Sequence, residues 1–574
     1  MAMRKIVRQD WFIVAALWSA PVVFLSIFYF YPLGSILTTS FSRGEGSLAS
    51  PFYEMLSSTV TRNIFWFTIW QAALSTILTL IVGLPGAYLL ARFNFRGKSL
   101  LLALTSIPFV LPTLVVASAF SALLGPRGWL NLALMGLFDL SHPPIQFVNT
   151  FWAILIAHVF YNTTIILRSV GDFWSHLDPR QGQAGQVLGA NRFQTLLHIT
   201  LPLLMPAILA AAMLVFIFDF TSFGVILVLG GPRYATLEVE IYYQTISLFN
   251  LPLAAALSVL QLVCTLGFMV FYTRLSANVS RPFTLRPRTY TQSRLISWKS
   301  RTFASLYIIF LIAFLITPLI ALAARSFTRL EPNRGQLTPV QTGFTLDYYK
   351  ELSGNRRQSL FYAPPSTAIA VSLAYALTTI ILSLSLGFPA SLALAREGGK
   401  GINRVFDPLI MLPLGTSAVT LGLGFIIALS HPPLDLRKSV LLIPLAHTLV
   451  AFPFVVRSLT PALRSIKPRL RQAASVMGAS PVQVLRHVDL PLTGRALLVA
   501  ATFAFTISLG EFGATALIYR PEYPTLPVMI YRYLSQPGGL NYGQALALST
   551  ILMVITGAGM LAIERFRIAD IGEF

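Results

Sequence analysis

The chain has 574 residues, of which 55% are hydrophobic and only 11% are charged. Soluble domains usually carry about a quarter charged residues, so this composition excludes an ordinary soluble enzyme. The formal net charge of +21 would also suit a nucleic-acid-binding protein. Either a nucleic acid or a membrane could be the partner of such a basic chain. The positions of the positive residues in the sequence distinguish these two alternatives.

Runs of about 20 apolar residues recur along the chain, and each can cross the roughly 30 Å core of a bilayer as a helix. The first run far exceeds the apolar core of a signal peptide, so we expect it to be a span. The sequence predicts an all-α integral membrane protein with about twelve transmembrane helices. The runs are 12–38, 63–91, 99–124, 147–168, 201–230, 249–273, 303–324, 366–395, 405–430, 438–457, 491–519 and 541–563.

Basic residues follow every second apolar run, whereas the loops between are poor in basic residues or balance them with acids. This is the positive-inside pattern of membrane proteins. It explains the net charge without nucleic acid and predicts a bacterial or archaeal cytoplasmic (inner) membrane protein with both termini in the cytoplasm. The basic segments are 92–98, 168–192, 274–301, 396–404, 457–486 and 565–567.

Motifs for catalysis or cofactor binding are missing from the sequence. The single cysteine, Cys264, lies within the sixth run and cannot form an intrachain disulfide or a multi-cysteine metal site. Gly97-Lys98-Ser99 looks like the end of a phosphate-binding loop, but Arg92 stands where the first glycine of that motif is required. No spacing of His and Cys suggests zinc. We therefore predict no catalytic residue, no metal site and no cofactor in this chain.

The chain is a tandem duplication. Residues 157–242 match residues 446–531 without a gap, as where Ala157-His158 meets Ala446-His447. Upstream, Gly83-Leu84-Pro85 resembles Gly387-Phe388-Pro389 after a change of register, as loop insertions would produce. Each of these prolines lies within a span and is expected to kink it. The predicted units are a first six-span half (1–275), a cytoplasmic linker (276–301) and a second half (302–574), related by an axis along the membrane normal. A solute path would run between the halves.

One loop occurs in both halves and predicts a short helix, a glycine turn and a second helix. Asp178-Pro179, and Ser465 with Pro468, supply residues that start helices. A glycine ends the first short helix, and Asn191 or Ser480 then stands where an N-cap belongs. The residues that define the loop are Gln183, Ala184, Gly185 and Gly189 in the first half, and Gln472, Ala473, Ala474 and Gly478 in the second.

Both copies fit the spacing EAA-x3-G-x9-I-x-L-P, with Val488 at the isoleucine position of the second. In this respect the chain resembles the permeases of binding-protein-dependent, ATP-driven (ABC) importers. The resemblance implies the type I importer permease fold and makes the doubled loop the coupling helix for a separate cytoplasmic ATPase. The implied partners are an ATP-binding subunit, as a dimer, and an extracytoplasmic solute-binding protein. The family's glutamate is Gln183 or Gln472 here, so a charge-assisted contact from that position is absent.

Two acids inside predicted spans, Asp219 and Glu511, suggest a translocation path or gate, because a charge in hydrocarbon is costly. Under the repeat Glu511 matches Ser222, one helical turn from Asp219, and Phe223 matches Phe512. A cationic solute and a structural or gating role both fit these acids.

The segment 220–242 resembles thiamine permeases, which are also fused twelve-span chains. The segment 508–513 fits them and also resembles molybdate and sulfate permeases, and fused ferric-iron permeases share the length. We place thiamine first, ferric iron second and other small solutes, such as molybdate, sulfate or polyamine, third. A secondary transporter is the alternative class, but it would need no doubled loop for an ATPase.

Overall fold

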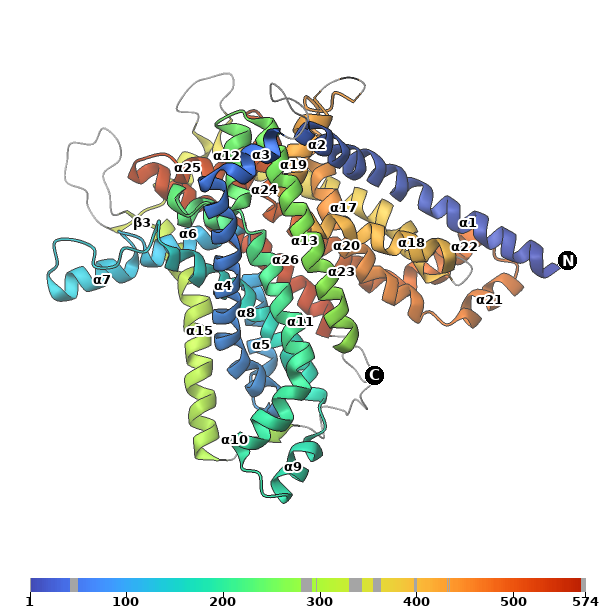
Figure 1. Cartoon of the computed structure of the whole chain (residues 1–574), viewed down its shortest axis with the longest axis horizontal. Helices are drawn as coiled ribbons and strands as arrows, with labels where there is room; N and C mark the ends of the chain where they lie inside the picture. Colours follow the sequence, from blue (N-terminus) through green and yellow to red (C-terminus); the bar gives the residue numbers. More distant parts are fainter. Residues whose placement is uncertain are drawn as a thin grey trace.

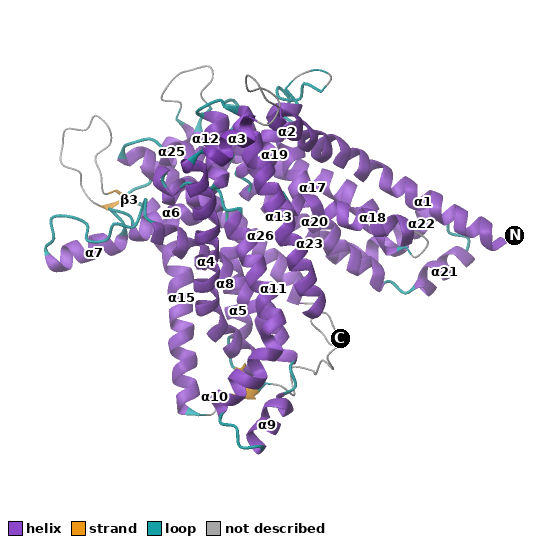
Figure 2. Cartoon of the chain, in the orientation of Figure 1, coloured by secondary structure: helices purple, strands orange, loops and turns teal. Residues whose placement is uncertain are grey.

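The computed structural model describes residues 2–41, 50–279, 292–295, 297–329, 343–354, 363–396, 400–430, 432 and 434–568. Much of the predicted linker 276–301 therefore lies outside the described residues. Within them the chain is almost entirely helical (Figure 2). Eleven helices are long and apolar enough to cross a membrane, or twelve if one bent pair counts as a span. These helices confirm the prediction of an all-helical membrane protein with about twelve spans.

In the first sequence half, long helices alternate with short ones. Short π-helical turns interrupt the first span at Ser26–Phe30 and precede α11 at Leu196–Thr200. The helices are α1 (Ala2–Leu25), α2 (Tyr31–Phe41), α3 (Ser50–Ser57), α4 (Thr59–Arg92), α5 (Lys98–Val110), α6 (Thr113–Leu124), α7 (Trp129–Phe138), α8 (Phe151–His176), α9 (Pro179–Val187), α10 (Arg192–Thr195), α11 (Leu201–Phe220), α12 (Leu237–Ile246) and α13 (Leu251–Val279).

The second sequence half repeats this order. Two small sheets are also described: β1 (Phe93–Asn94) pairs in parallel with β2 (Ser293–Arg294), and β3 (Thr328–Arg329) pairs antiparallel with β4 (Gly343–Phe344). The helices are α15 (Trp298–Ser326), α16 (Asp347–Lys350), α17 (Pro365–Ala395), α18 (Lys400–Met411), α19 (Ala418–Ala428), α20 (Leu442–Ser465), α21 (Pro468–Val476), α22 (Pro481–Val484), α23 (Leu490–Gly510), α24 (Gly513–Ile518), α25 (Leu526–Leu534) and α26 (Gly539–Ile568).

Two helical arms diverge from a common body (Figure 1). One arm contains α4, α8 and α11 and ends in the pair α9–α10, and the other contains α17, α20 and α23 and ends in α21–α22. The body holds α12, α19, α24 and α25, and α12 contacts α19 and α24 across the two sequence halves. The two copies of the repeated loop therefore form the two separate tips of the molecule.

The first span of each sequence half packs on the arm of the other half. Helix α1 runs along α17, and the Trp18 indole N–H donates to Asn403 Oδ1 at 3.1 Å. Helix α15 packs on α6 and contacts α4, and the Tyr307 hydroxyl donates to the Val82 carbonyl at 2.8 Å. The boundaries 1–275 and 302–574 stay a prediction, and the packing exchanges one span between these two predicted units.

Two of the expected single spans are broken helix pairs. The run 99–124 forms α5 and α6, which are separated at Leu111-Pro112, where proline has no N–H to continue the helical ladder. The run 405–430 forms Asn403–Gly415 and Ala418–Ala428, which meet at 97°. Ser417 caps the second piece, because its hydroxyl accepts from the N–H groups of Val419 and Thr420. Both runs were predicted as continuous spans. Pro112 explains the first break, and the Ser417 cap starts a new helix at the second.

Small residues set the closest helix contacts at equivalent places in the two arms. A Cβ at Gly83 of α4 would lie 2.7 Å from Ile166 of α8, and one at Gly387 of α17 would lie 2.4 Å from Val455 of α20. Glycine therefore permits these helices to approach closely, as in many membrane helix pairs. Both α4 and α17 continue through their internal prolines, Pro85 and Pro389.

Candidate coupling loops and central gate

Each repeated loop begins with a short helix that follows a long one directly. Asp178 caps α9, because its carboxylate accepts from the Arg180 N–H at 3.0 Å. In the second copy the N-cap is Lys467, which makes no side-chain cap. Ser465 was predicted to start this helix, but it ends α20, where its hydroxyl donates to the Ala462 carbonyl at 2.7 Å. The prediction for Ser465 was wrong because two residues still separate it from the first residue of α21.

The glycine turns have the backbone that the repeated motif predicts. Gly189 and Gly478 have φ values of 93° and 86°, a left-handed conformation that a side chain strains. In both loops the next residue's N–H bonds back to the helix: Ala190 to the Gly185 carbonyl and Ala479 to the Ala474 carbonyl, each at 3.0 Å. These bonds close a Schellman-type helix end.

The second helix of each loop begins with a capping box, as the positions of Asn191 and Ser480 predicted. Asn191 accepts from the Gln194 N–H, and the Gln194 side chain accepts from the Asn191 N–H. Ser480 and Gln483 exchange the same two bonds. Both orphan donors of each helix start are therefore satisfied, and the loop is a rigid helix–turn–helix element.

Two apolar side chains cover the tip of each loop, and they occupy equivalent positions of the repeat. Val187 and Leu188 are 87% and 88% exposed, and Val476 and Met477 are both 88% exposed. Exposed apolar pairs of this kind mark interaction surfaces when they recur at one place. The sequence analysis singled out the polar and glycine positions and missed these residues, although their recurrence 289 residues apart is visible in the sequence.

The remaining motif residues support the tips. Gln183 and Gln472 are exposed on α9 and α21, beside the exposed Ala184 and Ala473. Gly185 is buried, since a Cβ there would lie 2.3 Å from the Ile199 side chain. Ala474 is partly buried at the equivalent position. The glutamines of both copies thus face outward, near the exposed apolar pair.

The two loops differ in one ion pair. Arg471 Nε lies 2.7 Å from Asp489 Oδ1, and the Arg471 side chain also bonds to the Leu463 carbonyl. At the equivalent positions the first loop has Gly182 and Thr200. The Asp489 carboxylate is buried, so the pair ties α21 to the start of α23. The second loop is therefore braced in a way that the first is not.

Four aromatic rings meet where the two sequence halves face each other in the body. The rings of Phe223 and Phe512, which are equivalent in the repeat, stack with centroids 5.4 Å apart and planes 23° apart. Tyr242 lies 5.4 Å from Phe223, and its equivalent Tyr531 lies 5.5 Å from Phe512. We call these four residues the aromatic quartet. It closes the interface between the halves with buried apolar surface.

Asp219 lies at the end of α11 inside the first arm and is 1% exposed. Its Oδ1 accepts from the Asn162 amide at 2.7 Å and lies 3.4 Å from His158 Nδ1. His158 Nε2 pairs with the Ser222 hydroxyl at 2.9 Å. The predicted site residues Asp219 and Ser222 thus share one buried imidazole on α8.

Glu511 lies directly after α23 and is 8% exposed. Its carboxylate accepts from the N–H groups of Ala514 and Thr515 at 2.8 and 3.1 Å, which places it at the start of α24. It also lies 3.3 Å from His447 Nε2. His447 Nδ1 pairs with the Ser508 hydroxyl at 2.8 Å.

The two histidine clusters occupy equivalent places in the repeat, but the acid and the serine have exchanged positions. Ser508 stands where the first half has Asp219, and Glu511 stands where the first half has Ser222. In both clusters a histidine ring contacts one acid and two hydroxyl groups, but the acid lies on opposite sides of the ring. Asp219 and Ser75 lie beside His158 Nδ1, whereas Glu511 and Thr515 lie beside His447 Nε2. Both acids contact their own arm and avoid lipid, and each carboxylate has partners within its own half. The similar depth of the two acids stays a prediction, and each carboxylate has its described partners in its own half of the chain.

A third buried acid joins the two halves, and the sequence analysis did not single it out. Glu238 of α12 is 1% exposed. Its Oε2 accepts from the Ser417 hydroxyl at 2.5 Å, and its Oε1 accepts from the Gln261 amide at 2.6 Å. Ser417 belongs to the second half and caps α19. Comparison of the two halves does not reveal Glu238, because the equivalent residue of the second half is Pro527.

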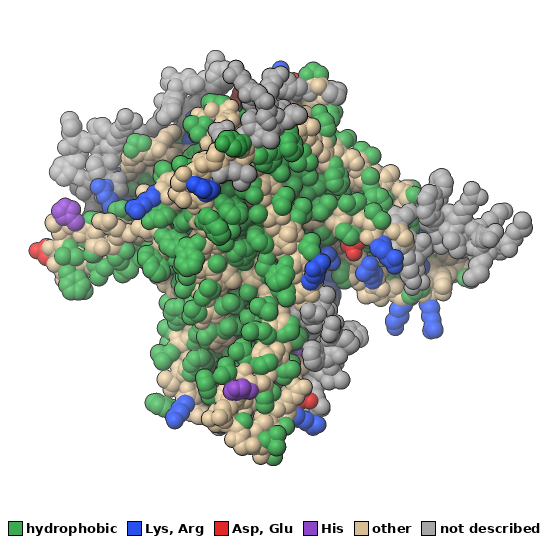
Figure 3. All heavy atoms as spheres, viewed as in Figure 1, with side chains coloured by type: hydrophobic (Ala, Val, Ile, Leu, Met, Phe, Trp, Pro, Cys, Tyr) green, Lys and Arg blue, Asp and Glu red, His purple; other side chains and the backbone are tan. Residues whose placement is uncertain are grey.

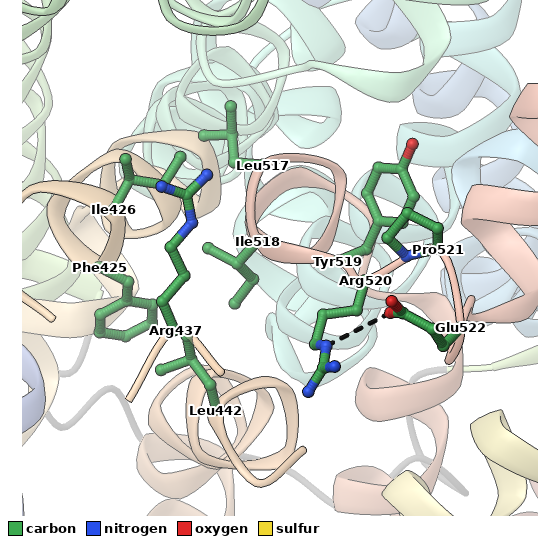
Figure 4. A pocket seen from close by; sticks show the side chains of 10 residues that line it. All are labelled: Phe425, Ile426, Arg437, Leu442, Leu517, Ile518, Tyr519, Arg520, Pro521 and Glu522. Carbon is green, nitrogen blue, oxygen red and sulfur yellow. Dashed lines mark ion pairs between the residues drawn. The ribbon is translucent and has the colours of Figure 1, made fainter. Parts of the chain in front are cut away.

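A pocket of about 230 Å³ opens at the end of the second half opposite α21, between α19, α24 and the start of α20 (Figure 4). Arg520 lies beside it and pairs with Glu522, with Nε and Oε2 3.4 Å apart. The lining residues of the pocket are Phe425, Ile426, Arg437, Leu442, Leu517, Ile518, Tyr519, Arg520, Pro521 and Glu522.

Known proteins resemble this chain over most of its length. The family model described as "Binding-protein-dependent transport system inner membrane component" matches residues 83–281 and 387–567, once in each half. A thiamine transport system permease protein of Brucella abortus is 29% identical over 93% of this chain and 92% of its own length. The Escherichia coli protein of the same description is 26% identical over 86% and 88%.

A solved bacterial ABC transporter for alginate import aligns with a TM-score of 0.42 and 17% identity, over 49% of this chain and 100% of that one. The two matches of the family model cover more than half of the chain. The chain therefore belongs to the inner-membrane components of binding-protein-dependent transport systems, and it carries the family's permease domain twice.

Proposed function

We propose that this permease moves thiamine across the membrane between its two halves. The observation that carries the proposal is the similarity, over more than nine-tenths of both chains, to permeases described as thiamine transport proteins. The aromatic quartet supports it, because thiamine carries a positively charged aromatic thiazolium ring and aromatic faces attract organic cations. Asp219 and Glu511 are buried and bonded within their own arms, although Asp219 Oδ2 has no hydrogen-bond partner among the described residues.

Uptake of radiolabelled thiamine tests the substrate. The chain would be reconstituted in proteoliposomes with an ATPase and a solute-binding protein from the same organism. We expect ATP-dependent thiamine accumulation that a tenfold excess of unlabelled thiamine suppresses. Ferric iron chelates, molybdate and sulfate are the comparison solutes. Accumulation of one of these in place of thiamine would refute the substrate assignment and leave the permease function intact.

The energy for transport is supplied, in this proposal, by a separate ATPase dimer that docks on the tips of α9 and α21. The tips present matching apolar pairs on rigid capped loops, at the ends of two separate arms (Figure 1). Figure 3 shows Lys and Arg side chains near both tips and also at the opposite end of the body, so the assignment of the tips to the cytoplasmic side rests on the basic loops of the sequence. The solute-binding protein would contact the opposite end of the body.

This orientation predicts which residues a membrane-impermeant thiol reagent can reach. In a Cys264→Ala background, Ser480→Cys should react only when the cytoplasmic face is accessible, as in inside-out vesicles. Ser141→Cys, at the other end of the first half, should react only from the outside. Both side chains are exposed, so accessibility does not limit either reaction. The reverse labelling pattern would contradict the proposed topology.

The aromatic quartet is the proposed gate. Phe223→Ala with Phe512→Ala removes the stacked pair and opens the interface between the halves. We expect thiamine trapped in proteoliposomes to leak out without ATP. Phe120→Ala is the matched control, because Phe120 is buried within the first half and loses similar packing, roughly 3–5 kcal/mol. Equal leakage from both variants would show general loosening and exclude a specific gate.

A further inference from the structure

Helix α7 carries an apolar surface that the transport function does not explain. Its ten residues, Trp129–Phe138, contain a single polar side chain, Asn131. Leu137 is 76% exposed and Phe138 is 63% exposed, and Trp129, Leu130 and the following Leu140 are exposed as well. A helix that is apolar on all sides is normally buried in protein or in lipid, and α7 is not buried in this protein.

The polar residue of α7 fixes the helix to the body. Asn131 is fully buried. Its amide donates to the carbonyls of Gly125 and Ile145, both at 2.8 Å, and its Oδ1 accepts from the Ile145 N–H at 2.9 Å. These bonds hold the base of α7 against the end of α6 and the returning chain. The rest of α7 projects outward from this anchored base. The exposure of α7 is therefore a property of the folded structure.

The position of α7 indicates what covers it. It projects sideways from the body near the end of α15 that carries β3, and runs across the direction of that span (Figure 1). Hydrophobic side chains gather on the side of α7 that faces along the span, and continue the apolar surface of the arm (Figure 3). On α15 that surface includes exposed Leu306, Ile309 and Phe310. The helix is therefore continuous with the lipid-facing surface of the spans.

The ends of α7 and its counterpart in the second half agree with this position. Arg127 precedes the helix, and Asp139, Ser141 and His142 follow it, so polar residues frame the apolar segment. In the second half the segment after α19 is short and charged, with Asp435, Arg437 and Lys438. The duplicated fold thus forms without such a helix, and α7 is an addition to one half.

We infer that α7 lies along the membrane surface on the side opposite the coupling tips, with its apolar side chains among the outer parts of the lipid acyl chains. Helices α6 and α7 are together long and apolar enough for a span (Thr113–Phe138), but in this inference only α6 enters the body and α7 stays near the surface. Trp129 and Phe138 then lie at the headgroup boundary, where aromatic residues of membrane proteins concentrate. The helix fixes the first arm at the membrane surface where α6 and α8 meet. This inference needs only the membrane location of the chain and is independent of its substrate.

Depth-resolved quenching tests the inference. In a Cys264→Ala background, single cysteines replace Leu137, Ser141 or Ile309 and carry a bimane fluorophore in phosphatidylcholine nanodiscs. Ser141→Cys is the water-exposed control, and Ile309→Cys on α15 is the deep-lipid control. We expect the label at 137 to be quenched more by a 5-doxyl than by a 12-doxyl lipid, and little by iodide. The label at 141 should show the reverse preference between lipid and iodide.

Two results would overturn the inference. The first is strong iodide quenching at 137 with no lipid quenching, while the label at 309 still reports an intact membrane arm. The second is protection of 137 from iodide only after the solute-binding protein is added, which would make α7 a protein-docking surface. Quenching of both control labels is measured under the same conditions. A misfolded protein is recognised by the loss of lipid quenching of the label at 309.

Discussion

Exchanging Val476 and Met477 for aspartate is expected to abolish ATP hydrolysis that depends on the solute-binding protein. The two side chains form the exposed apolar tip of the second loop. In a docked complex they would be buried, and loss of such anchors costs about 2–4 kcal/mol, or roughly 30- to 1000-fold in affinity. Aspartates would add unpaired buried charge to that loss. Co-purification of the ATPase with the tagged permease measures docking directly.

The matched control is Val482→Asp. Val482 is also exposed, at 71%, and belongs to the same loop, but it lies on α22 beyond the glycine turn. We expect it to retain the ATPase and normal stimulation. Gly478→Arg should resemble the tip variant, because a long side chain at φ 86° strains the turn beside the contact surface. Normal stimulation in the tip variant would contradict the proposed docking surface.

The corresponding change in the first loop, Val187→Asp with Leu188→Asp, should have a similar effect. The second loop contains an additional vulnerable point, because Asp489 is buried with Arg471 as its ionic partner. Removal of one partner of a buried pair leaves an uncompensated charge. The first loop has neither residue of this pair, since Gly182 and Thr200 stand at the equivalent positions.

Replacing Glu511 by leucine is expected to destabilise the second arm strongly. The carboxylate accepts two backbone N–H groups of α24 and the Thr515 hydroxyl, and it faces His447. Leucine leaves these buried donors unpaired, at a cost of about 1–3 kcal/mol for each group. We expect a lower apparent melting temperature in detergent and loss of thiamine uptake. Asp219→Leu should act likewise on the first arm through Asn162 and His158.

Conservative variants separate the charge of the two acids from their bonds. Asp219→Asn and Glu511→Gln keep an oxygen that can accept from the same donors. If the acids only brace the arms, each variant should stay near the wild-type melting temperature and transport thiamine. If the double variant is stable but no longer transports, the negative charge itself acts on the solute. A rise in ATP hydrolysis without the solute-binding protein would instead show that the acids hold the resting state.

The parts of the structure that depend on local sequence were predictable. Apolar runs marked the spans, and the glycine and cap positions marked the loops, because a left-handed turn and an N-cap each require particular residues at one place. Asn191 and Ser480 confirm this in both copies. The breaks at Leu111-Pro112 and near Ser417 were missed, since a hydropathy pattern does not distinguish one long helix from two short ones.

The parts that depend on distant contacts were not predictable. The sequence marked Asp219 and Glu511 as notable acids, but it could not show that His158 and His447 lie against them from neighbouring helices. Glu238 is a similar case, because its partner Ser417 belongs to the other half of the chain. The repeat in the sequence suggested one incorrect feature of the packing. Similar halves suggest two self-contained bundles, whereas α1 and α15 exchange places.

That exchange has a consequence for how the protein is made. Trp18 of α1 and its partner Asn403 are 385 residues apart in the chain. At about 5–20 residues per second, a ribosome takes roughly 20–80 s to synthesise the intervening segment. During this time the first span, Val14–Phe41, must remain in lipid without its permanent neighbour, as its mean hydropathy of 1.8 permits. The first arm likewise lacks its packing partner α15 until that helix is inserted into the membrane. The first half is therefore still incomplete when its own last residue leaves the ribosome, because α15 is synthesised afterwards.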